Sequence, residues 1–202
     1  MPTEFLKEIY SESIRISADG FCFVMPDGTG HIGITGPCTA VPCQSAEQIS
    51  QNDAETLFHF VFPEHNDLSV CIDYIPGTEL AFVYGISSET IKVCAEQYGS
   101  YDICHYLTDI VKHRTGLICN GILVVRRGSE TDIVAHNGSR VCYLNTLHIG
   151  ENYQLLYSIL KIWKECGLRQ DNARISLCGI SAEGSLVRNL KQMIGNNRVC
   201  VL

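Results

Sequence analysis

The sequence predicts an α/β protein of two lobes, each built on a mixed sheet that helices cover. Two observations lead to this fold. A three-stranded meander occurs near the start of the chain and again after Gly116, and helices and further strands follow each meander. The length of 202 residues and the hydrophobic fraction of 46% also allow a full core without disulfides or metal. We expect the lobes over residues 1–100 and 101–202, with a cleft between them.

The first meander is expected between Ser13 and Thr35. Asp19-Gly20 and Pro26-Asp27-Gly28 are typical turn sequences, because glycine adopts positive φ freely and proline presets the turn. The other elements expected in this lobe are a loop with Pro37 and Pro42, a helix from about Asn52 with Asn or Asp as its cap, strands over 68–74 and 79–84, and a helix from Ser87 to Tyr98.

The second lobe repeats this architecture without repeating the sequence. The segment from Tyr101 to Arg114 is expected to be helical, and Asn137-Gly138 is a strong hairpin signal in the meander that follows. A clear apolar stripe predicts a helix from Asn152 to Cys166, which Gly167 ends. The remaining elements expected are meander strands over 117–127, 131–136 and 139–149, a strand over 174–178, a helix from about Glu183 to Ile194, and a strand over 198–202.

Charge and cysteine usage indicate a cytoplasmic protein. The chain has 15 basic and 22 acidic residues, a net charge of −7, which argues against general binding to nucleic acid or anionic membranes. Most of its 11 cysteines lie in apolar runs, where a reduced thiol acts as a small hydrophobic group. The N-terminus has no signal-peptide pattern, and no window of about 18 uncharged apolar residues predicts a membrane span.

Several segments resemble the DUF3822 family of Bacteroidetes, which is uncharacterised and has an actin-like (RNase H-like) ATPase fold. They are SIRISADGFCFVM, His105-Tyr106, and YLNTLHIGENYQLLYSILKIWKECGL followed by ISLCG. The resemblance covers most of the chain, least between Gly36 and Gln51, and implies two actin-like lobes but no established activity. Family members usually continue past Leu202, so it also implies that the second lobe lacks its last strand or helix.

The resemblance places a first candidate phosphate turn at Ser17, Asp19 and Gly20. In actin-like ATPases the first turn of each meander wraps the phosphates, and acidic residues there hold the water shell of Mg²⁺, a cation that binds oxygen ligands. Ser17 stands where the resemblance implies an acid. An ordinary tight hairpin accounts for Asp19-Gly20 equally well.

The second candidate turn contains Arg126, Gly128 and Ser129, and Gly179 belongs to the strand–turn–helix that contacts adenosine in such proteins. Arg126 stands where an acid is implied; arginine repels a metal ion but binds phosphate. The plain alternatives are a basic exposed hairpin and a strand-to-helix loop with Ser181 as helix cap. These substitutions predict that ATP hydrolysis is lost and that no metal is bound.

Other chemistry has less support in the residues. Cys38 and Cys43 have the wrong spacing for zinc and no matching pair downstream. Cys104 and His105 are neighbours on an expected helix, where adjacent side chains point in different directions and form no nucleophile–base pair. His105 and Asp109 are read as a plain contact one helical turn apart.

The sequence therefore predicts a protein without enzymatic activity or a required cofactor. We interpret it as a non-catalytic interaction or scaffold module that binds a protein partner, not nucleic acid or membrane. The alternative is a nucleotide-binding protein without efficient hydrolysis, which binds ATP in the cleft through Arg126 or Arg127 and the turn amides in place of Mg²⁺. A thiol enzyme is a third hypothesis, although no cysteine has an evident activating partner.

Overall fold

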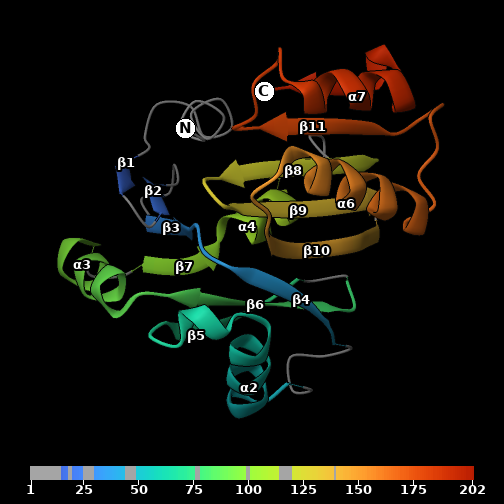
Figure 1. Cartoon of the computed structure of the whole chain (residues 1–202). Helices are drawn as coiled ribbons and strands as arrows, with labels where there is room; N and C mark the ends of the chain where they lie inside the picture. The colour runs from blue at the N-terminus through green and yellow to red at the C-terminus, as the bar shows by residue number, and fades with distance from the viewer. Residues whose placement is uncertain are drawn as a thin grey trace. The chain divides into compact units, whose positions relative to one another are not determined.

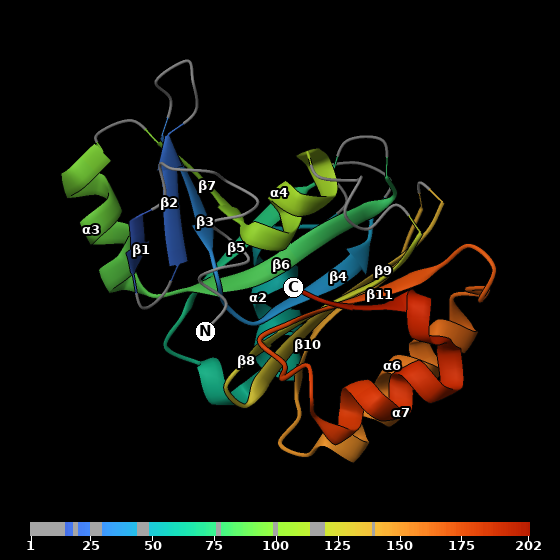
Figure 2. The ribbon, with the colours of Figure 1, turned by 90° about the horizontal axis from the view of Figure 1, so that it is seen from above.

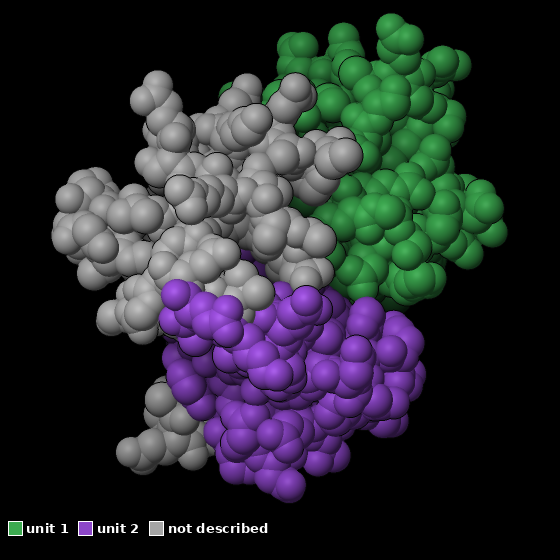
Figure 3. All heavy atoms as spheres, turned by 90° about the vertical axis from the view of Figure 1, so that its left-hand side faces the viewer, with its two compact units in different colours: residues 1–5, 114–202 green, residues 6–113 purple. Residues whose placement is uncertain are grey.

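The computed structural model describes residues 15–17, 20–24, 30–43, 49–75, 78–98, 101–113, 120–138 and 140–202. The chain divides into two compact units (Figure 3). The N-terminal unit comprises residues 6–113, and the described part of the C-terminal unit runs from residue 120 to residue 202. The compact units divide the chain after His113, whereas the sequence places the lobe boundary at residue 100. That lobe boundary stays a prediction.

The C-terminal unit is built on a mixed sheet with the order β12-β11-β8-β9-β10. Figure 1 labels four of these strands, from β11 to β10. Strands β8, β9 and β10 form the expected antiparallel meander. Strand β11 runs parallel to both β8 and β12. The strands are β8 (Gly121–Arg127), β9 (Glu130–Asn137), β10 (Arg140–His148), β11 (Arg174–Cys178) and β12 (Val199–Val201). The meander, the parallel strand after it and its last neighbour therefore agree with the sequence-based expectation.

Helices α6 (Asn152–Glu165) and α7 (Ser185–Ile194) cover one face of this sheet (Figure 2). Apolar side chains at helical spacing form the contact, since Leu155 and Ile159 of α6 and Leu190 of α7 are fully buried in one core with strand residues. Gly167, with φ of 64°, follows α6 and allows the chain to turn back. The long helix predicted from its apolar stripe is thus confirmed.

The N-terminal unit contains the first three-stranded meander of the chain and a separate antiparallel group. In the first sheet the order is β1-β2-β3-β7, and in the second group β6 lies between β4 and β5. The elements are β1 (Arg15–Ser17), β2 (Gly20–Val24), β3 (Gly30–Ile34), β4 (Cys38–Pro42), α2 (Gln51–Val61), a short 3₁₀ turn (Pro63–His65), β5 (Ser69–Tyr74), β6 (Leu80–Ile86), α3 (Ser88–Tyr98), β7 (Tyr101–His105) and α4 (Tyr106–His113).

The two units differ in which strand of the meander pairs with a parallel strand from later in the chain. In the C-terminal unit β11 pairs in parallel with β8, the first strand of its meander. In the N-terminal unit β7 pairs in parallel with β3, the last strand of its meander. The meander is therefore repeated, whereas the sheet order around it is not.

Two element predictions in the N-terminal unit are wrong. The segment with Pro37 and Pro42 is not a loop, because β4 pairs with β6 and Pro42 occupies the end of the strand. The segment from Tyr101 to Arg114 is helical only in its second half. Its first half is β7, which a parallel partner distant in sequence stabilises, and local periodicity cannot reveal such a partner.

The cap predicted for the first helix is also wrong. The N-cap of α2 is Ser50, whose hydroxyl oxygen accepts a hydrogen bond from the Asp53 backbone N–H at 3.1 Å. Asn52 and Asp53, which lie close behind Ser50, are equally good N-cap residues by type, so only the hydrogen bond identifies the position. Within the ranges given above, no helix is both long and apolar enough to cross a lipid bilayer.

Candidate functional site

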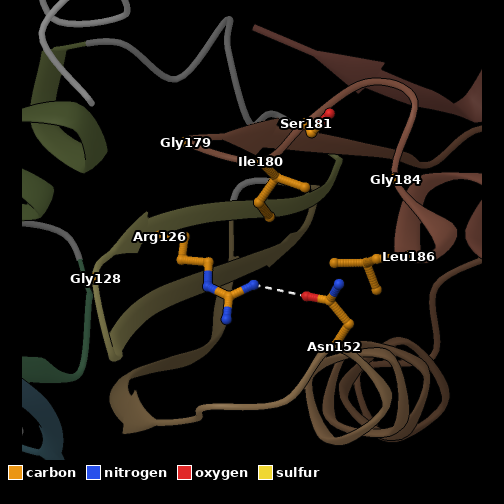
Figure 4. A pocket seen from close by; sticks show the side chains of 8 residues that line it. All are labelled: Arg126, Gly128, Asn152, Gly179, Ile180, Ser181, Gly184 and Leu186. Carbon is orange, nitrogen blue, oxygen red and sulfur yellow. Dashed lines mark hydrogen bonds between the residues drawn. The ribbon is translucent and has the colours of Figure 1, made fainter.

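A pocket of about 350 Å³ lies in the C-terminal unit, beyond the carboxyl ends of β8 and β11 (Figure 4). The starts of α6 and α7 complete its wall. Its lining consists of Arg126, Gly128, Asn152, Gly179, Ile180, Ser181, Gly184 and Leu186. Ligands of open α/β sheets commonly bind at this edge, and the volume falls within the range of small-molecule sites.

Two glycines shape the pocket wall. Gly179 directly follows β11 with φ of 71°, and a Cβ atom there would lie 2.5 Å from the carbonyl oxygen of Arg126. Gly128, with φ of 63°, forms the tight turn between β8 and β9 and has open space around it. The chain can therefore pass close to the end of β8 only because residue 179 has no side chain.

Among the described residues that line this pocket, Arg126 is the one that carries a charge. Its Nη1 donates a hydrogen bond to Oδ1 of Asn152 at 2.7 Å, and its Nη2 donates to the carbonyl oxygen of Gly150 at 2.9 Å. These bonds tie the end of β8 to the start of α6 (Figure 4). They also hold the guanidinium, a group with five N–H donors, in a defined orientation.

The start of α7 adds backbone donors to the pocket. Its N-cap is Gly184, without a side-chain cap, so the cap predicted at Ser181 is wrong. Ser181 instead accepts a hydrogen bond through its carbonyl oxygen from the Gly184 N–H at 3.0 Å. The first N–H groups of a helix carry a partial positive charge, and together with Arg126 they make the pocket suitable for an anion.

The acidic residues of the β8–β9 hairpin form ion pairs instead of lining the pocket. Arg127 binds Asp132 through Nε at 2.7 Å and Nη2 at 2.9 Å, and it binds Glu130 through Nη1 at 2.9 Å. The Thr146 hydroxyl donates a further hydrogen bond to Asp132 at 2.7 Å. The Asp132 side chain is fully buried, so this carboxylate stabilises the hairpin and is closed to a metal ion.

The structure brings together three of the residues that the sequence selected. Arg126, Gly128 and Gly179 line one pocket, whereas Ser129 contributes a carbonyl oxygen to the Ile149 N–H at 2.9 Å. Two further candidates lie in the N-terminal unit, where they are register partners in the β1–β2 hairpin: Ser17 and Gly20. Asp19, the last candidate, lies outside the described residues.

Sequence reasoning did not select Asn152, although it binds Arg126 directly. A signal was available, because Asn152 begins the helix that follows the second meander, and such helices start at an edge of the sheet. Leu186, in the first turn of α7, was not selected either. In the described parts of the chain, no group of three His, Cys, Asp or Glu side chains is arranged to hold a metal ion.

A separate buried polar cluster lies in the N-terminal unit. Asp73 accepts hydrogen bonds from the His105 backbone N–H at 2.8 Å and from the Tyr84 hydroxyl at 3.1 Å. The His105 ring bonds to the Gly36 carbonyl oxygen at 3.0 Å through Nε2. Burial raises the pKa of the Asp73 carboxyl, and the hydrogen bonds that it accepts oppose this shift. Because these groups are deeply buried, we assign them a structural role.

Comparison with known proteins agrees with this fold. A Bacteroides thetaiotaomicron protein of unknown function with an actin-like ATPase fold is similar over 94% of this chain and 89% of its own, with 18% identity and a TM-score of 0.73. The chain thus has the actin-like ATPase fold. No curated protein matches it. Residues 38–196 match the family described as "Protein of unknown function (DUF3822)", and because this match spans most of the chain, the protein belongs to that family.

Proposed function

We propose that this protein is a non-catalytic member of the actin-like fold, which acts by binding a protein partner and not by hydrolysing ATP. The observation that carries the proposal is the ion pairing of the hairpin acids. Asp132 and Glu130 both form ion pairs with Arg127. Arg126 lines the pocket at the position where a carboxylate would be needed to bind Mg²⁺.

The energetics support this interpretation. A divalent cation about 4 Å from a guanidinium is repelled by several kcal/mol at an effective dielectric constant of about 20. Releasing Asp132 to bind the cation would break a buried ion pair, which costs about 3–5 kcal/mol. Both terms oppose a metal-bound triphosphate beside Arg126.

Exposed aromatic residues on α6 support a binding role. Tyr153 and Tyr157 are each 68% exposed and lie four residues apart, so they occupy the same side of the helix. Aromatic side chains are enriched in protein interfaces, where they bury a large area with few rotatable bonds. We therefore expect a partner to contact α6 through this pair.

Two measurements test the proposal. Purified protein should release no phosphate from ATP above a protein-free blank, with or without Mg²⁺. Affinity isolation from the source organism should recover a partner that the Tyr153→Ser/Tyr157→Ser variant loses and the Met193→Ser variant keeps, since Met193 is an exposed residue of α7. Hydrolysis that disappears in Asp132→Asn would contradict the proposal, as would equal recovery by both variants.

A second candidate function is nucleotide binding without Mg²⁺ in the pocket of Arg126. The fixed guanidinium favours it because arginine binds phosphate, and Gly128, with open space around it, lets phosphate oxygens approach the backbone. ATP without Mg²⁺, at about 100 times its dissociation constant, should stabilise the protein by about 2.7 kcal/mol in thermal melts. Arg126→Gln should abolish the shift and Arg169→Gln, a surface control, should keep it; a shift that persists in Arg126→Gln would count against this site.

A further inference from the structure

A second hollow, at the opposite end of α6 from the Arg126 pocket, brings two cysteines together. Its volume is about 330 Å³, and it is lined by Asn137, Arg140, Cys142, Glu165 and Cys166. Cys142 is exposed in β10, and Cys166 is half-buried at the C-cap of α6. The sequence suggested that both are small hydrophobic residues, and their proximity requires the tertiary structure.

A β-bulge in β10 explains how Cys142 reaches the helix. Val141 is opposite His136 in β9 and Tyr143 is opposite Ala135, so Cys142 is the extra residue without a register partner. Consecutive side chains of a regular strand point to opposite faces, whereas a bulge redirects one of them. Consistent with this, Cys142 lines the same hollow as Cys166 at the end of α6.

The backbone holds Cys166 in place without help from its thiol. The Asn137 side chain, at the β9–β10 turn, donates a hydrogen bond from Nδ2 to the Cys166 carbonyl oxygen at 2.9 Å. The Cys166 N–H donates to the Ile162 carbonyl oxygen at 2.8 Å. The end of α6 is thus fixed to the same hairpin that carries Cys142. A thiol held in this way beside a mixed disulfide attacks it faster than a thiol on a separate molecule does.

The two thiols differ in their surroundings. Burial raises the pKa of Cys166 to about 12, and its interaction with Cys142 adds to this shift. Cys166 is therefore protonated near neutral pH. Cys142 is exposed, and the hollow around it holds one charge of each sign, Arg140 and Glu165, so a reagent of either charge can approach.

We propose that Cys142 and Cys166 are a reversible oxidation site, which a low-molecular-weight disulfide such as glutathione disulfide closes into an intramolecular disulfide. The Cys142 thiolate attacks one sulfur of the reagent, forms a mixed disulfide and releases the first glutathione. Cys166 then loses its proton and attacks the Cys142 sulfur, which releases the second glutathione. Two protein thiols are oxidised and one glutathione disulfide is reduced to two thiols.

Peptide mapping of the folded protein tests this site. After treatment with glutathione disulfide, tryptic residues 141–161 should be linked to residues 165–169, and dithiothreitol should separate them. Both Cys142→Ser and Cys166→Ser should abolish the link, and Cys166→Ser should retain a stable glutathione adduct on Cys142. Cys200→Ser, which removes an exposed cysteine of β12, should leave the link intact.

Three results would overturn the proposal. The first is a stable glutathione adduct on Cys142 of the unaltered protein without any link to Cys166. The second is a link that forms in urea and not in native buffer. The third is loss of the link in Cys200→Ser. Circular dichroism of each variant shows that it is folded, and Cys142→Ser changes an exposed side chain, so its fold should be retained.

Discussion

Substitutions in the buried ion pair of the β8–β9 hairpin give the most direct test of whether Asp132 is held in a structural role. Arg127→Met removes the guanidinium that binds Asp132 twice and Glu130 once. The Asp132 side chain is 0% exposed and that of Arg127 is 15% exposed, so water cannot replace the lost partner readily. The free energy of unfolding should fall by about 3–5 kcal/mol, because a buried charge is left without compensation.

A double-mutant cycle separates this pairing from simple loss of packing. Asp132→Asn should cost less when Arg127→Met is already present, with a coupling energy of about 1–3 kcal/mol. The matched control is Arg126→Met, which removes the neighbouring arginine and should cost about 1 kcal/mol or less, since its hydrogen bonds are exposed.

Urea titration followed by tryptophan fluorescence measures the free energy of unfolding of the C-terminal unit, which contains all three substituted residues. Trp163, the one tryptophan of the sequence, is buried in the core of the C-terminal unit. If Arg127→Met destabilises the protein no more than Arg126→Met does, or if the effects of Arg127→Met and Asp132→Asn are additive, then Asp132 is not held as a structural ion pair. The proposal that this acid is unavailable for Mg²⁺ would lose its basis.

Four further substitutions test other features. Gly179→Ala and Gly128→Ala should each cost about 1 kcal/mol for left-handed backbone, and Gly179→Ala should cost clearly more, because its Cβ would lie 2.5 Å from the Arg126 carbonyl oxygen; equal losses in urea titrations would refute this contact. Burial raises the pKa of Asp73, so its stabilising contribution is present below about pH 4 and is lost as the pH rises through the folded-state value. Asp73→Asn should flatten this fall in melting temperature, and an unchanged pH profile would show that another group causes it. Phe58→Ala should cost about 3–5 kcal/mol in thermal melts, since Phe58 is fully buried in the N-terminal core; a loss under 1 kcal/mol would contradict that packing.

Turns and amphipathic helices could be predicted because their signals are local. Asn137-Gly138 marks the β9–β10 hairpin, where Gly138 has φ of 62°. The apolar stripe of α6 likewise predicts both its extent and its buried face. In contrast, β4 and β7 were missed, because a partner strand distant in sequence stabilises each of them.

The candidate site divides in the same way. The sequence by itself located the turns at the ends of two strands and showed that they carry Arg126, Gly128 and Gly179. Only the tertiary structure decided that Asn152 orients Arg126, that Arg127 encloses Asp132, and that a bulge brings Cys142 to Cys166. The physical reason is that hydrogen bonds, ion pairs and thiol contacts depend on distances across the folded chain, which no local pattern of residues encodes.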